Sequence, residues 1–167
     1  MSDELYKQMA QSVIDGDDDE ACRTLGWMKI SGLGAPKDKK GGRLIYEKAC
    51  DRGDVPSCAM AGDLNYAKRD RRARRYLERA CELEHMDSCA NLGWMLAHGE
   101  GDDADLPGAL RLYQRACAAG ESGACVLAGL HQRDHLEDRA AARRSFARAC
   151  ELGDRLACGN AASEAQR

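Results

Sequence analysis

Residues 89–125 have the sequence CANLGWMLAHGEGDDADLPGALRLYQRACAAGESGAC, which contains one complete unit of the repeat that decides the fold. Its last cysteine, Cys125, follows Cys117 by eight residues, and this spacing occurs four times in the chain. The four cysteine pairs are Cys50/Cys58, Cys81/Cys89, Cys117/Cys125 and Cys150/Cys158. The second cysteine of each pair, preceded by Cys22, recurs every 31 to 36 residues. A period of this length is typical of stacked helix pairs.

Each repeat contains two helical segments with different signatures. Each repeat begins at one of the cysteines Cys22, Cys58, Cys89 and Cys125. A glycine stands four residues after this first cysteine, at Gly26, Gly62, Gly93 and Gly129. Glycine in a helix interior costs about 1 kcal/mol relative to alanine, so its recurrence at one register predicts close backbone approach by a neighbouring helix. The second segment ends in an aromatic residue or leucine followed by x-x-Ala-Cys, beginning at Tyr46, Leu77, Tyr113 and Phe146. Residues with this spacing share one helix face.

Glycines also mark the connections between helices. Gly53, Gly120 and Gly153 stand three residues after a helix-ending cysteine, where a C-terminal cap needs a positive φ, and Glu84 takes this position in the remaining repeat. The longer repeats carry extra glycine-rich residues between their two helices, at 32–36 and 99–103. Each repeat is therefore predicted to consist of a helix, a loop, a second helix and a tight turn.

The composition agrees with a helical fold. Only seven of the 167 residues are Val, Ile or Thr, which nearly rules out a sheet protein. Leu, Ile, Val and Phe together make up 24 residues, so the core is expected to depend on alanine packing and on the nine cysteines. The longest uncharged stretch, residues 88–99, is too short to span a membrane. With a net charge of −3, the basic run at 68–75 is interpreted as a solvated helix face rather than a nucleic-acid site.

The repeat resembles the Sel-like repeat (SLR) family, a relative of the tetratricopeptide repeat. The resemblance covers residues 3–165. It is carried by Leu25-Gly26, Leu92-Gly93, the loops Gly32-x-Gly34-x-x-x-Asp38 and Gly99-x-Gly101-x-x-x-Asp105, and the Tyr-x-x-Ala-Cys helix ends. The cysteine pairs are similar to those of the Helicobacter cysteine-rich protein type. The chain departs from the pattern at Met60-Ala61-Gly62, and Cys22 has no partner eight residues earlier because residue 14 is Ile.

We therefore expect an all-α fold: a right-handed α/α superhelix (solenoid) of about four and a half helix-pair repeats with disulfide staples. The whole chain, residues 1–167, is expected to form a single domain. Its predicted parts are an N-terminal capping half-repeat (3–21), four repeats (22–57, 58–88, 89–124 and 125–157) and a C-terminal cap (158–167).

The resemblance implies that each cysteine pair forms a disulfide bond between adjacent helices. The cysteines concerned are Cys50, Cys58, Cys81, Cys89, Cys117, Cys125, Cys150 and Cys158. Cys22 is then a free thiol, expected to be buried opposite Ile14. Structural zinc ligands usually stand two to four residues apart, and neither this spacing nor a Cys-x-x-Cys redox motif occurs. The alternative is that all the cysteines are small buried thiols of a protein in a reducing cytosol.

Disulfide bonds predict an oxidising compartment, such as the periplasm, the extracellular space or the mitochondrial intermembrane space. The N-terminal sequence MSDELYKQMAQ has acidic residues where a signal peptide has Lys or Arg, and no apolar stretch follows. We expect either that a leader has been removed or that the protein does not use this route, with the cytoplasm as the alternative location.

Solenoids of this kind bind extended peptides or partner segments on a concave face, which the first helices of the repeats line. The register predicts that the lining residues are Thr24, Met60, Asp63, Asn91, Leu127, His131 and Asn160. Asn91 and Asn160 are the sharpest candidates, because an amide can hold a peptide backbone through two hydrogen bonds, although both are also typical of an ordinary exposed position. Trp27 and Trp94 are expected in the core, with a peptide platform as the alternative.

No motif for catalysis is visible, and we expect no catalytic residue, no cofactor and no metal ion. No serine is followed three residues later by lysine, as serine β-lactamases require, and the four histidines form no metal cluster in the sequence. The predicted function is a protein- or peptide-binding repeat scaffold that is monomeric and has neither nucleic acid nor membrane as a partner. The resemblance implies one alternative, a penicillin-binding or weak β-lactamase-like hydrolase as in the cysteine-rich SLR subfamily.

Overall fold

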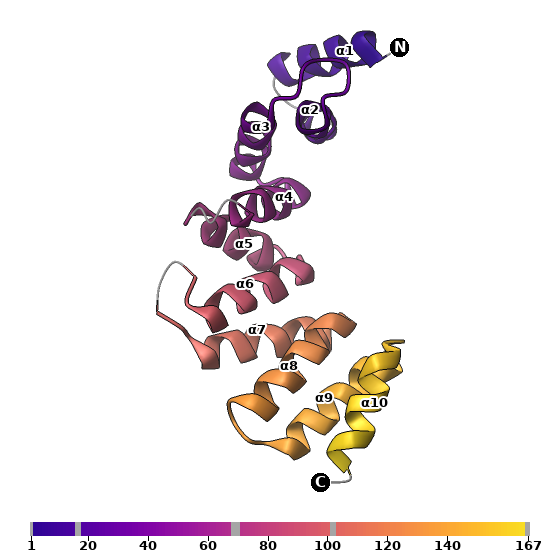
Figure 1. The fold of residues 1–167 in the computed structure, drawn as a ribbon. Coiled ribbons are helices and arrows are strands. Elements are labelled where there is room, and N and C mark those ends of the chain that lie inside the picture. The colour runs from indigo at the N-terminus through magenta and orange to yellow at the C-terminus, as the bar shows by residue number, and fades with distance from the viewer. Residues whose placement is uncertain (1, 16–17, 68–70, 101–102, 166–167) are drawn as a thin grey trace. The chain divides into compact units, whose positions relative to one another are not determined.

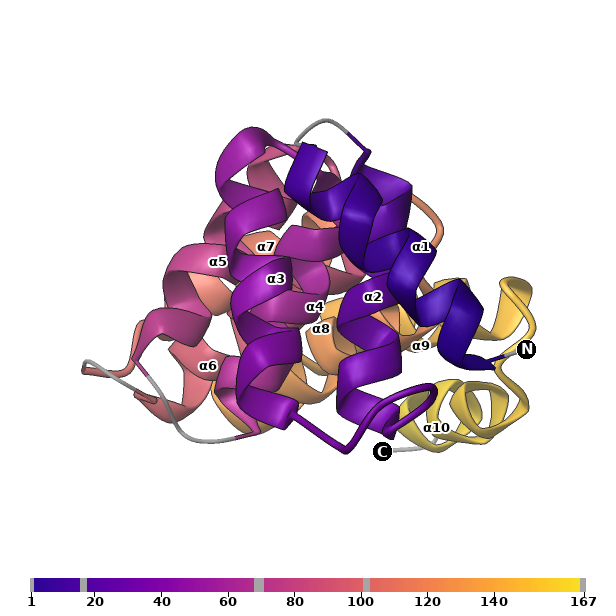
Figure 2. The same cartoon turned by 90° about the horizontal axis from the view of Figure 1, so that it is seen from above.

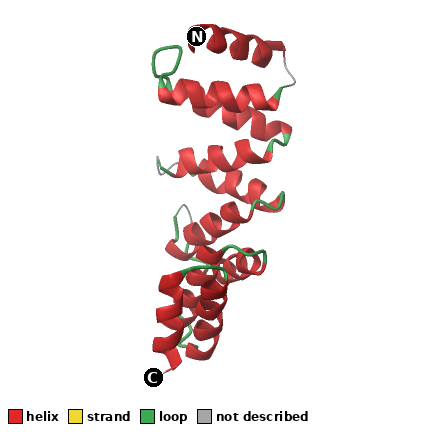
Figure 3. Ribbon diagram, turned by 90° about the vertical axis from the view of Figure 1, so that its right-hand side faces the viewer, coloured by secondary structure: helices red, strands yellow, loops and turns green. Residues whose placement is uncertain are grey.

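The computed structural model describes residues 2–15, 18–67, 71–100 and 103–165, without the side chains of residues 2 and 12–15. These parts of the chain form ten helices and no strand (Figure 1, Figure 3). The helices are α1 (Ser2–Asp15), α2 (Asp19–Ser31), α3 (Lys39–Arg52), α4 (Val55–Tyr66), α5 (Arg72–Glu82), α6 (Met86–His98), α7 (Leu106–Ala118), α8 (Ser122–Asp134), α9 (Arg139–Glu151) and α10 (Arg155–Ala165). The prediction of an all-α fold is confirmed. Within the described residues, none of the helices has the length and apolar character that crossing a membrane requires.

The chain divides into two compact parts, called unit 1 (Met1–Leu83) and unit 2 (Glu84–Arg167). In both units, helices that are neighbours in the sequence pack against each other. The even-numbered helices from α2 to α10 are the first helices of the repeats, and the odd-numbered helices from α3 to α9 are the second helices. Within unit 1, α2 and α3 lie side by side in Figures 1 and 2.

Short polar and glycine residues set the helix ends. Aspartates precede α2, α3, α4, α7 and α9, and each accepts a hydrogen bond from a backbone amide in the first turn. Gly53, Gly120 and Gly153 have φ angles of 104°, 104° and 99°, which confirms the predicted caps. Glu84 also has a positive φ, 65°, so the turn keeps its conformation where glycine is absent.

The recurrent mid-helix glycines make room for side chains of the second helix. A Cβ atom added to Gly26, Gly93 or Gly129 would lie 2.9, 2.8 or 2.7 Å from a ring atom of Tyr46, Tyr113 or Phe146, respectively. At Gly62 the same atom would lie 2.6 Å from Leu77. The prediction of close approach is therefore confirmed. The nearest atoms belong to the side chain that begins the x-x-Ala-Cys motif, and the backbone approaches as well, since a Cβ atom at Gly93 would lie 3.2 Å from the Ala109 carbonyl oxygen. The mid-helix glycine of the first helix and the residue that begins the x-x-Ala-Cys motif of the second helix thus contact each other.

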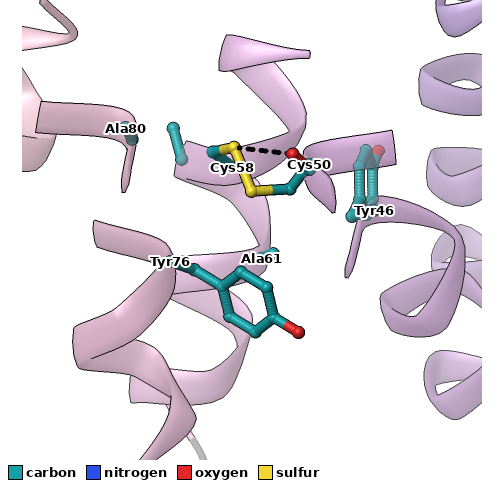
Figure 4. Packing of buried hydrophobic residues seen from close by; sticks show 7 residues of the cluster. Tyr46, Cys50, Cys58, Ala61, Tyr76 and Ala80 are labelled. Atoms are coloured by element: carbon teal, nitrogen blue, oxygen red, sulfur yellow. Dashed lines mark hydrogen bonds between the residues drawn. A yellow bond between two sulfur atoms is a disulfide. The ribbon is translucent and has the colours of Figure 1, made fainter. Parts of the chain in front are cut away.

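Alanines and disulfide-bonded cysteines fill much of the core. Figure 4 shows one cluster in unit 1, where Tyr46, Cys50, Cys58, Ala61, Tyr76 and Ala80 are all buried. The Cys50–Cys58 bond joins the end of α3 to the start of α4, with 4.5 Å between the Cα atoms.

Two further disulfides have the same position in their repeats. Cys117–Cys125 and Cys150–Cys158 have Cα–Cα distances of 4.6 and 4.8 Å. Cys81 and Cys89 are disulfide-bonded as well. The predicted disulfide staples are therefore present. Cys22 is free and buried, whereas its expected contact with Ile14 falls on a side chain outside the described residues.

Candidate functional site

The residues predicted to line a binding face have different environments. In unit 1, Thr24 on α2 is half-buried, and Met60 and Asp63 on α4 are exposed. In unit 2, Asn91 on α6 is exposed, and Leu127 on α8 and Asn160 on α10 are half-buried.

Asn91 and Leu127 line one hollow of about 390 Å³, which we call the unit 2 hollow. The described residues that line it are Asp87, Ala90, Asn91, Glu121, Gly123, Ala124, Val126, Leu127 and Asp154. Asn160 is not among these residues. Of the two asparagines that the sequence predicts to bind a peptide, only Asn91 therefore lines this hollow. The volume lies within the range of ligand pockets in proteins.

The hollow is acidic because helices begin beside it. Glu121 is the N-cap of α8, Asp154 precedes α10, and Asp87 is in the first turn of α6. Carboxylates are favourable at these places because the helix dipole is positive at its N-terminal end. Among the residues that the structure describes, no lysine or arginine lines the hollow. These carboxylates were missed in the sequence, although Glu121 and Asp154 share a register position four residues before a cysteine.

The expectation that the tryptophans lie in the core is wrong. Trp27 is 54% exposed and Trp94 is 41% exposed. The residues three, four and six positions after the cysteine, such as Leu25, Gly26 and Met28, turn one face of the helix toward the core. The position five after the cysteine lies on the opposite side at 100° per residue. The ring of Trp94 stacks on the imidazole of His98, with 4.0 Å between ring centroids.

The prediction that His131 lines a binding face is also wrong, because only 5% of this residue is exposed. Its ring meets the edge of Tyr113, with centroids 6.2 Å apart, and lies 4.8 Å from the His135 ring. Burial, followed by the charge of His135, lowers the pKa of His131. The physical reason is again the register: six residues after the cysteine is the core-facing position, which Met28 and Met95 occupy in other repeats.

Unit 1 contains a buried polar network that the sequence did not indicate. Asn65, fully buried on α4, accepts a hydrogen bond from Arg43 at 2.8 Å and donates to Glu47 at 3.0 Å and to the Ala61 carbonyl at 2.8 Å. Arg72 on α5 donates to Glu47 at 3.3 Å. The network thus connects α3, α4 and α5. A second hollow of about 240 Å³ lies beside it, lined by Ile30, Lys39, Arg43, Leu64 and Ala67.

Comparison with known proteins gives a consistent result for the family. The model of the Sel1 repeat family, described as "Sel1 repeat", matches residues 19–54, 59–85 and 87–121. Cytochrome c oxidase assembly factor 7 of Xenopus tropicalis is 30% identical over 119 residues, which cover 64% of this chain. The chain spans about half the length of this curated relative, 52%.

Two solved structures share the fold. The protective antigen c5321 of uropathogenic Escherichia coli, described as displaying an SLR fold, has a TM-score of 0.84 at 20% identity. The match covers 95% of this chain and 36% of c5321. Cysteine-rich protein B of Helicobacter pylori is 29% identical with a TM-score of 0.56, over 74% of this chain and 94% of that protein. Together with the cysteine-bounded helix pairs, these findings show that the chain belongs to the Sel1 repeat family.

Proposed function

We propose that this chain is a protein-binding repeat scaffold and that the unit 2 hollow takes an extended segment of a partner protein. Sel1 and related helix-pair repeats typically mediate protein interaction. The observation that carries the proposal is the composition of the hollow, in which an exposed amide, an apolar floor and carboxylates line one concave surface.

Each part of the lining suits a peptide. The Asn91 side chain carries both a donor and an acceptor, which match the C=O and N–H groups of an extended backbone. Ala124, Val126 and Leu127 present an apolar surface on which partner side chains lose contact with water. The carboxylates add charge selectivity, because an acidic partner surface is repelled.

The disulfide-bonded cysteines support an oxidising compartment for this function. We place the scaffold in the periplasm, the extracellular space or the mitochondrial intermembrane space, acting as a monomer with residues 1–167 as one domain. Reducing conditions would open the disulfides and weaken the helix pairs that form the hollow.

The experiment is a selection of random peptides displayed on phage against the oxidised protein. Selected peptides are then measured by isothermal titration with the wild type and with the double variant Asn91→Ala/Leu127→Glu. The matched control, Gln114→Ala/Ala140→Glu, makes the same types of change on exposed positions of α7 and α9.

We expect the hollow variant to bind the selected peptides ~10-fold more weakly or worse, and the control to bind as the wild type does. Equal affinity of the hollow variant and the wild type for every selected peptide would refute the proposal. Circular dichroism of both variants establishes that the helices are retained.

A further inference from the structure

In unit 1, an ion pair joins two successive first helices of the repeat. Asp54, four residues before Cys58, is the N-cap of α4, and its Oδ2 accepts a hydrogen bond from the Ser57 amide at 3.1 Å. Its other oxygen, Oδ1, accepts from Nη1 of Arg23, which stands one residue after Cys22 on α2. The Asp54 side chain is only 8% exposed. An arginine of one first helix thus covers the carboxylate at the start of the next first helix.

Unit 2 repeats this register without the arginine. Glu121 stands four residues before Cys125, and the position of Arg23 in the preceding first helix is taken by Ala90. Asp154 likewise precedes its cysteine by four residues, and Val126 stands in the position of Arg23. Both carboxylates and both small apolar residues line the unit 2 hollow. The place that a guanidinium fills in unit 1 is therefore open in unit 2.

The carboxylates keep an oxygen available for such a contact. Asp154 uses one oxygen, Oδ1, for both cap hydrogen bonds, from the Leu156 and Ala157 amides at 3.0 and 3.1 Å. Its Oδ2 corresponds to the oxygen of Asp54 that is not used for the cap. The Glu121 side chain makes no cap hydrogen bond.

We infer that the unit 2 hollow recognises arginine side chains of its partner, which bind Glu121 and Asp154 over the surfaces of Ala90 and Val126. The inference rests on the proposed function and specifies the chemistry of the partner. Arginine fits better than lysine, because its planar guanidinium forms two parallel hydrogen bonds with a carboxylate and is weakly hydrated on its faces. Those faces can lie on the methyl groups of Ala90 and Val126, as an ammonium ion cannot.

The test uses three short synthetic peptides of otherwise identical sequence, acetylated and amidated, which carry arginine, citrulline or lysine. Citrulline has nearly the shape of arginine without the charge. Each is titrated into ¹⁵N-labelled, oxidised protein, and backbone amide shifts give the affinity and the place of binding. We expect the arginine peptide to shift amides around Glu121, Val126 and Asp154 and to bind ~10-fold more tightly than the citrulline peptide.

Three variants complete the test. Glu121→Gln/Asp154→Asn removes both charges at nearly constant size and is expected to lower the affinity for the arginine peptide ~10-fold. Val126→Arg supplies an arginine from within the chain, as in unit 1, and is expected to compete with the peptide. Glu151→Gln on α9, at an exposed residue that is not named among the lining residues, is the control and is expected to leave the affinity unchanged.

Equal binding of the arginine and citrulline peptides, or of the arginine and lysine peptides, would overturn the inference. Unchanged affinity of Glu121→Gln/Asp154→Asn would overturn it as well. These outcomes are distinct from a failure of the proposed function. Phage-selected peptides that bind the hollow without any arginine refute this inference alone, whereas peptides insensitive to Asn91→Ala/Leu127→Glu refute the proposed function.

Discussion

From the contact between Gly129 and Phe146 we predict how the variant Gly129→Ala changes the free energy of unfolding. The added Cβ atom would lie 2.7, 2.8 and 2.9 Å from three atoms of the Phe146 ring, which is fully buried. Overpacking a core usually costs about 1–3 kcal/mol, whereas alanine in place of a helix-interior glycine contributes about 1 kcal/mol of stability. The free energy of unfolding of unit 2 is therefore expected to fall by ~1 kcal/mol.

Gly159→Ala is the matched control, because Gly159 lies inside α10 and an added Cβ atom there would have no neighbour within 4 Å. This variant is expected to gain up to ~1 kcal/mol from helix propensity alone. Urea unfolding followed by circular dichroism measures both free energies of unfolding, and the two variants should differ by ~2 kcal/mol with opposite signs. If Gly129→Ala proved as stable as Gly159→Ala, the ring would not be the reason for the glycine, and the packing argument would be refuted.

Three further predictions concern the rest of the scaffold. Replacing both Cys50 and Cys58 by serine opens one short loop, and the resulting loss in the free energy of unfolding in urea should be about 2–3 kcal/mol larger without reductant than with it, whereas equal losses would mean that the bond is absent. Asn65→Leu leaves the buried Glu47 carboxylate without its amide donor, so we expect a loss of about 1–3 kcal/mol by the same assay, and an unchanged midpoint would contradict the role of the network. Because burial lowers the pKa of His131, the unfolded chain takes up this proton first, and stability is lost as the pH falls below about 6.5. Unfolding midpoints over a pH series should show this slope in the wild type and a shallower one in His131→Gln, and identical slopes would contradict it.

Local features of the repeat could be predicted from the sequence because each depends on a few neighbouring residues. The eight-residue cysteine spacing corresponds to the end of one helix and the start of the next, and the structure places the bonded Cα atoms of Cys50 and Cys58 4.5 Å apart. The glycine caps could be predicted for the same reason, because the low steric cost of a positive φ belongs to glycine itself. Gly53 and Gly120 have a positive φ, and Glu84 also has a positive φ in the one repeat without glycine at this position.

Side-chain environments were harder to predict, because residue type and register gave opposite indications. Trp94 is large and apolar, yet its position five after the cysteine turns it outward, whereas the polar His131 stands in a core-facing position. Register was the better guide in both cases. Comparing His131 with Met28 and Met95 in the sequence would have placed it correctly.

The acidic hollow could not be predicted because it depends on residues of α6 and α8 and on the residues that precede α8 and α10. Ala90 and Glu121 are far apart in the sequence and become neighbours only when successive first helices stand next to each other. The composition did not indicate the acidic hollow either, because a net charge of −3 does not show where the carboxylates lie in the fold. The network around Asn65 was missed for the same reason, because its members Arg43, Asn65 and Arg72 come from three different helices.

The scaffold consists of helix pairs in which every paired cysteine is oxidised, and a thiol count tests this most directly. The denatured, unreduced protein is alkylated and its intact mass is determined, followed by peptide mapping. We expect one alkylated residue, Cys22, with the other eight cysteines in disulfide bonds. Nine alkylated cysteines would contradict it, because the helix pairs and the hollow would then have to be held by alanine and glycine packing alone.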